Sequence, residues 1–89
     1  MAGYVMIRQR VRDFEEWKRG YDAHIEERVV RGLTEKHVFR RAGDEHEVFV
    51  LLRAVDIDRA REFAASNSLK QAMEKAGVID RPDIFLLEE

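Results

Sequence analysis

Two segments of this 89-residue chain are apolar at every position, and they constrain its fold more than any other feature: Val48–Leu52 and Ile84–Leu87. Side chains alternate between the two faces of a β-strand, so an unbroken apolar run predicts a sheet that is apolar on both faces. The helices can cover only one of these faces, because short right-handed crossovers place successive helices on the same side. We therefore predict that the other face packs against a second copy, in a symmetric homodimer.

The side chains that this second face would expose follow from the strand alternation. Leaving several of them in water costs several kcal/mol, at roughly 25 cal/mol for each Å² of apolar area, which is a large share of a small domain's stability. An exposed patch of this kind marks an interface. We expect it to contain Met6, Phe49, Leu51 and one of the pairs Ile84/Leu86 and Phe85/Leu87.

The other periodic segments predict a single α+β domain over residues 1–89, with the order βαββαβ and a four-stranded antiparallel sheet. A first helix is expected from Asp13, whose side chain caps it, to Gly32. A second helix begins at Asp56, but its apolar residues on either side of residues 66–68 face nearly opposite directions, so we expect a break there and a new start at Ser68. The strands are expected at residues 4–11, 34–41, 47–54 and 83–87.

Composition excludes several classes of function. Lys and Arg number 16 against 18 Asp and Glu, and the formal net charge of −2 argues against nucleic acid as a partner. The absence of cysteine removes disulfides and thiolate metal sites and fits a reducing, cytoplasmic location. We expect no membrane span and no secretory leader, because no apolar run is long enough, and we find no histidine–carboxylate spacing that indicates a metal.

Two motifs resemble those of the dimeric α/β-barrel superfamily. One is Asp13-Phe14-x-x-Trp17-Lys18 followed by His24 and Arg28, and the other runs from Ser66-x-Ser68-Leu69-Lys70 to Ala76-Gly77-Val78. Within the superfamily, the whole chain is similar to small bacterial proteins described as antibiotic biosynthesis monooxygenase-like or cyclase-like. The resemblance implies a ferredoxin-like protomer, an obligate dimer that forms an α/β barrel, and a pocket between the sheet and the helices of each subunit.

The resemblance does not imply one reaction. The superfamily includes cofactor-independent oxygenases of aromatic polyketides, polyketide cyclases, haem-degrading enzymes, dismutases and proteins with no assigned activity. No single catalytic set is common to these branches. A haem-degrading function would need an axial histidine, for which His24 is the only candidate in this chain.

Arg28 and His24 are the candidate catalytic residues. On an ideal helical wheel, Arg28 lies in the apolar stripe with Trp17 and Tyr21, where a permanent charge is costly unless it is paired. It is either an anchor for an anionic substrate or a cation near the helix end that extends outward to solvent. His24, one turn before Arg28, is either a proton shuttle or a structural histidine bonded to a nearby carboxylate or carbonyl.

Four further residues are candidates for substrate binding, each with a structural alternative. Trp17 and Tyr21 either wall a pocket for a flat ligand or fill the core. Gln9 lines the same cavity as His24 if its strand face meets the helices, and otherwise it satisfies backbone groups at the strand end. Ser66 lies at the helix break, where its hydroxyl either faces a ligand or caps a helix.

These residues favour a small-molecule enzyme that acts without cofactor or metal. Arg28 would hold an acidic aromatic or polyketide-like substrate as its anion, and His24 would move a proton in a cyclase- or monooxygenase-type reaction. The alternative is a non-catalytic dimer that binds a small ligand or a protein partner. The RNA-recognition motif has the same element order, but its third strand needs glycine and exposed aromatic residues, and Glu47–Leu52 contains no glycine.

Overall fold

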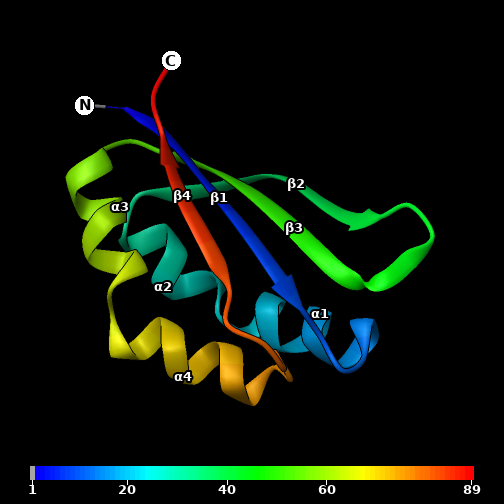
Figure 1. The fold of residues 1–89 in the computed structure, drawn as a ribbon. Coiled ribbons are helices and arrows are strands. Elements are labelled where there is room, and N and C mark those ends of the chain that lie inside the picture. Colours follow the sequence, from blue (N-terminus) through cyan, green and yellow to red (C-terminus); the bar gives the residue numbers. More distant parts are fainter. Residues whose placement is uncertain (1) are drawn as a thin grey trace.

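A computed structural model describes residues 2–89 and confirms the ferredoxin-like α+β fold. Figure 1 shows a four-stranded antiparallel sheet with all the helices on one side of it. None of these helices has the length and apolar character that crossing a membrane requires. The elements are β1 (Gly3–Arg10), α1 (Phe14–Ala23), α2 (Ile25–Val30), β2 (Leu33–Arg41), β3 (Asp44–Ala54), α3 (Ile57–Ala64), α4 (Asn67–Lys75) and β4 (Asp83–Leu87).

The strand order β2-β3-β1-β4 places β1 inside the sheet, between β3 and β4. The register aligns Val5 of β1 with Leu52 on one side and Leu86 on the other. Every second residue of β1 and β3 is buried against the helices, as the period of two requires. The largest fully buried side chains of the core are Val5, Val11, Trp17, Val48, Val50, Leu52 and Phe63.

The first helix is not continuous, contrary to the prediction. α1 ends at Ala23 and α2 begins at Ile25, with His24 between them at φ −95° and ψ 13°. The last carbonyl groups of a helix lack the usual partner four residues further on. The Tyr21 carbonyl oxygen accepts from the His24 N–H at 3.2 Å and, as a second donor, from Nη1 of Arg28 at 2.8 Å. The bond from Arg28 keeps α2 packed against the end of α1 and draws the Arg28 side chain inward.

The break predicted in the second helix is confirmed, although the residue that caps the new helix is Ser66 and not Ser68. Ser66 is extended, at φ −78° and ψ 145°, and its hydroxyl accepts from the Leu69 N–H at 3.1 Å. The change of direction lets Phe63 of α3 and Leu69 of α4 both reach the core. One straight helix could not bury both, because they lie on different sides of it.

The face of the sheet away from the helices is apolar at its centre and charged at its ends, and nothing in residues 2–89 covers it. Met6 lies at its centre, aligned with Leu51 of β3 and Phe85 of β4. Phe85 is 51% exposed, whereas Ile84 packs against the core, so the expected patch contains the pair Phe85/Leu87. This open face carries Tyr4, Met6, Phe39, Phe49, Leu51, Phe85 and Leu87.

The close approach of α1 and α4 gives a stability prediction at Gly20. A Cβ on Gly20 would lie 2.7 Å from the Cβ of Ala76, so the two helices would have to separate. Overpacking costs about 1–3 kcal/mol, whereas replacing a helical glycine by alanine gains about 0.5–1 kcal/mol. We expect Gly20→Ala to lower the free energy of unfolding by about 1 kcal/mol in urea titrations. Arg19→Ala, at an exposed position, is the control, and a more stable Gly20→Ala protein would contradict the close packing.

Candidate functional site

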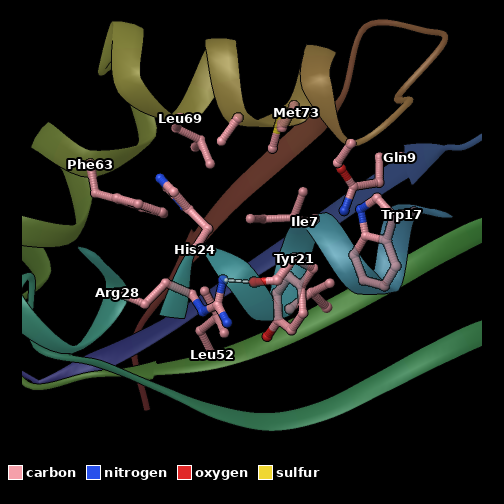
Figure 2. A pocket seen from close by; sticks show the side chains of 14 residues that line it. Ile7, Gln9, Trp17, Tyr21, His24, Arg28, Leu52, Phe63, Leu69 and Met73 are labelled. Atoms are coloured by element: carbon pink, nitrogen blue, oxygen red, sulfur yellow. Dashed lines mark hydrogen bonds between the residues drawn. The ribbon is translucent and has the colours of Figure 1, made fainter. Parts of the chain in front are cut away.

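A cavity of about 40 Å³ lies between the covered face of the sheet and the helices, and most of the candidate residues line it (Figure 2). Its walls are mainly apolar. Ile7 and Val50 come from the sheet, and Leu69 and Met73 come from α4. Four polar side chains and one indole complete the wall: Gln9, Tyr21, His24, Arg28 and Trp17.

Arg28 is 5% exposed, so the structure places its guanidinium inside and not in solvent. Its Nη1 donates to the Tyr21 carbonyl oxygen, and its central carbon lies 3.8 Å from the centroid of the Tyr21 ring. No carboxylate of residues 2–89 comes within ion-pair distance of it. A buried charge without a counterion is costly. The remaining N–H groups of Arg28 can therefore bind an anionic oxygen inside the cavity.

Tyr21 combines an aromatic wall with an unpartnered hydroxyl. Its ring stacks on Trp17, with centroids 4.9 Å apart and planes at 21°. The hydroxyl is buried and makes no hydrogen bond within residues 2–89. Burial raises the pKa of this hydroxyl well above its ordinary value; the positive charge of Arg28 acts in the opposite direction, and the nearby Glu35 carboxylate raises the pKa further. Tyr21 is therefore a neutral group that can donate to a ligand at physiological pH.

Gln9 contributes a second unpartnered polar atom from the sheet. The residue is 2% exposed, and its Oε1 is buried without a hydrogen bond within residues 2–89. Its strand face is the one that meets the helices, so its amide lies in the cavity wall with His24. Buried polar groups without partners are uncommon in folded proteins, and two in one cavity are typical of a binding site.

His24 lies at the junction of α1 and α2, in ion-pair contact with a carboxylate. Its Nε2 lies 2.6 Å from Oε2 of Glu27, three residues further on. The same carboxylate accepts a hydrogen bond from the Ser68 hydroxyl of α4 at 2.5 Å and lies 3.4 Å from the Arg31 guanidinium. The Ser68 hydroxyl, and then the neighbouring His24 and Arg31 side chains, lower the pKa of Glu27. Its carboxylate is therefore charged at neutral pH.

Two of these positions differ from the expectations drawn from the sequence. Ser66 does not line this cavity, because its hydroxyl donates to the Phe63 carbonyl oxygen at 2.7 Å and caps α4. Glu27 was not among the candidates. The only local signal for it is its spacing of three residues from His24, which puts the two side chains on one helical face. Its bond to Ser68 spans 41 positions and cannot be seen from local periodicity.

The size of the cavity limits what it can hold in this conformation. One water needs about 10–15 Å³ of such volume, and an apolar cavity of about 150 Å³ binds benzene. The present volume of about 40 Å³ fits roughly three waters and no aromatic ring. A flat ligand therefore requires a helix to move away from the sheet. Within residues 2–89, no three His, Asp or Glu side chains are grouped to hold a metal ion.

The unpartnered hydroxyl gives a direct test of the geometry. Replacing a tyrosine whose hydroxyl is hydrogen-bonded by phenylalanine typically lowers the free energy of unfolding by about 1 kcal/mol. Removing an unsatisfied buried hydroxyl leaves the free energy of unfolding unchanged or raises it. We expect Tyr21→Phe to leave the free energy of unfolding unchanged or to raise it. Trp17→Ala empties part of the core and should lower the free energy of unfolding by about 3–5 kcal/mol in the same titration. A clear loss of stability in Tyr21→Phe would show that the hydroxyl has a partner.

Comparisons with known proteins identify the architecture. No family model matches the chain, and no curated protein matches it. A candidate antibiotic biosynthesis monooxygenase from Caulobacter crescentus is 15% identical, with a TM-score of 0.74 over 99% of this chain and 89% of that one. A conserved protein from Methanosarcina mazei is also 15% identical, with a TM-score of 0.75 over 100% of this chain and 93% of that one.

A third similar structure is that of SnoaB, a cofactor-independent oxygenase from Streptomyces nogalater. It is 12% identical, with a TM-score of 0.72 over 99% of this chain and 94% of that one. Identities this low establish the fold and leave the activity to be argued from the site. The resemblance expected from the sequence is confirmed in this sense: the chain has the fold of the antibiotic biosynthesis monooxygenase-like proteins.

Proposed function

We propose that the protein is a small-molecule enzyme that acts without a cofactor, by proton transfer on an acidic, aromatic or polyketide-like substrate. The observation that carries the proposal is the buried guanidinium of Arg28, which has no carboxylate partner among residues 2–89 and faces a mainly apolar cavity. A site of this composition favours a ligand that is largely apolar and carries one anionic oxygen. A substrate of that kind would supply the missing charge.

The roles of the residues follow from their chemistry. His24 removes a proton from the substrate, and the enolate or phenolate that results places its negative oxygen toward Arg28. Trp17 and Tyr21 provide the flat apolar walls, and Gln9 and the Tyr21 hydroxyl bond the substrate's other oxygen atoms. The anion then either closes a ring by aldol addition or reacts with dioxygen. SnoaB, described as a cofactor-independent oxygenase, is a precedent for chemistry without a cofactor on this fold.

A non-catalytic ligand-binding dimer is the second candidate. The observation that favours it is the bond between His24 and Glu27, since a histidine with a structural role is held in the same way. The two candidates differ in whether substituting His24 affects turnover or only affinity.

A homodimer through the open face is part of the proposal. The charged side chains at one end of this face are already paired within the chain, because Arg8 lies 2.7 Å from Asp83 and 2.9 Å from Asp80. The centre of the face is the apolar patch around Met6, and Arg53 lies at its other end, aligned with Tyr4 and Thr34. An apolar patch with charged side chains at its rim fits a second copy of itself.

Oligomeric state tests the dimer. We expect sedimentation equilibrium to give a dimer at micromolar concentration, and Met6→Glu to give a monomer, because a charge at the centre of the interface cannot be buried without a partner. Val30→Glu is the matched control, since Val30 is 70% exposed on α2, on the other side of the sheet. A wild-type monomer, or a dimer that survives Met6→Glu, would contradict this arrangement.

Ligand binding and turnover test the role of Arg28. Acidic phenols and enolisable polyketones are offered to the dimer, and binding is measured by calorimetry and turnover by product formation and dioxygen uptake. Arg28→Gln should weaken binding about 10- to 100-fold, because hydrogen bonds to a charged group contribute about 1.5–3 kcal/mol. Arg19→Gln, at an exposed position of α1, should have no effect. Equal affinity of the Arg28→Gln and wild-type proteins would remove the anion-binding role.

A further inference from the structure

The Glu27 carboxylate has a place in the site that the roles above do not use. Its side chain is only 23% exposed, and it lies between α2 and α4. One oxygen, Oε2, contacts both Nε2 of His24 and the hydroxyl of Ser68, and the other, Oε1, faces Arg31. Three side chains therefore fix the orientation of one carboxylate.

This geometry favours one position for the proton of His24. Oε2 of the charged carboxylate lies 2.6 Å from Nε2 and can only accept, so a neutral imidazole suits this contact with its proton on Nε2. Nδ1 makes no hydrogen bond within residues 2–89, and His24 is part of the cavity wall. The nitrogen left with a free lone pair is therefore Nδ1, which is the atom that can accept a proton.

We infer that Glu27 is a positioning residue for His24: it holds the imidazole as the Nε2–H tautomer, so that Nδ1 is the basic atom of the site. The inference rests on the proposed function, since a proton acceptor matters only if the site moves a proton. When Nδ1 accepts a proton from the substrate, the imidazolium lies against the negative charge of Glu27, which stabilises it. When the proton returns to the alkoxide of the ring-closed product, or to the peroxide formed from dioxygen, His24 is neutral again.

Ser68 extends this arrangement to α4. Its hydroxyl donates to Glu27, so the carboxylate cannot turn away from His24 without losing a bond to another helix. α4 also carries Leu69 and Met73 of the cavity wall. The orientation of His24 is thus coupled to the helix that closes the cavity.

The first measurement needs no substrate. The ¹⁵N shifts of His24 in the ligand-free dimer, recorded at about pH 9 where imidazole is neutral, report which nitrogen is protonated. We expect the wild-type protein to show the Nε2–H tautomer alone and Glu27→Ala to show a mixture of the two. Glu26→Ala is the matched control, because Glu26 is the exposed neighbour on the same helix. Unchanged His24 shifts in Glu27→Ala would overturn the inference.

Ser68→Ala is the milder second variant, in case Glu27→Ala does not fold. It keeps the carboxylate but removes the group that contributes most to its low pKa. We expect the pKa of Glu27, followed by ¹³C shifts, to rise toward its ordinary value. A group with a depressed folded-state pKa stabilises the fold above its unfolded pKa and loses that contribution as the pH falls through the folded value. The acid unfolding midpoint of Ser68→Ala should therefore shift to higher pH, and an unchanged Glu27 pKa would count against the inference.

A kinetic measurement separates this inference from the proposed function. Where turnover is found, Glu27→Ala should lower kcat about tenfold or more and leave KM nearly unchanged, because Glu27 does not touch the substrate. An unchanged kcat would overturn the positioning role. If no substrate is turned over while the tautomer is still held by Glu27, the proposed enzyme fails and the structural assignment of Glu27 and His24 stands.

Discussion

The hydrogen bond from the Arg28 guanidinium to the Tyr21 carbonyl oxygen is the interaction on which the site depends. It adds a side-chain donor to a carbonyl that also accepts the His24 N–H at the end of α1, and it holds the Arg28 side chain of α2 against that end. The same guanidinium lies over the Tyr21 ring, which stacks on Trp17. The Arg28 side chain therefore contacts the end of α1, packs on the aromatic wall of the cavity and places a positive charge there.

Several polar groups of the cavity lack the hydrogen-bond or ion-pair partners that charged groups elsewhere in residues 2–89 have. Arg8 on the open face of the sheet has carboxylate partners on several sides, whereas Arg28 has none within residues 2–89. Gln9 Oε1 and the Tyr21 hydroxyl are also without partners. Each unsatisfied buried group costs about 1–3 kcal/mol, and small domains are stable by only about 5–15 kcal/mol. All three groups line one cavity, where a ligand of complementary polarity would supply the partners that they lack.

Much of the fold could be predicted from the sequence, and part of the site. The strands begin and end within a few residues of the expected positions, and the apolar face with Met6, Leu51 and Phe85 was expected from alternation alone. Gln9, Trp17, Tyr21, His24 and Arg28 lie at one cavity because the periods of strand and helix place them on facing surfaces. The division of the first helix at His24 was missed, because it depends on a side chain that bonds a carbonyl seven residues back.

Local alternation and helical period determined the element order, the break near residue 66 and the doubly apolar sheet, because these depend only on which residues are neighbours along the chain. Tertiary structure alone decided that Ser66 is used up in capping α4, that Gln9 and Tyr21 keep unpartnered atoms, and that Glu27 lies between His24 and Ser68. Those outcomes depend on distances between segments far apart in the sequence, and hydrogen bonds are sensitive to a few tenths of an ångström in such distances.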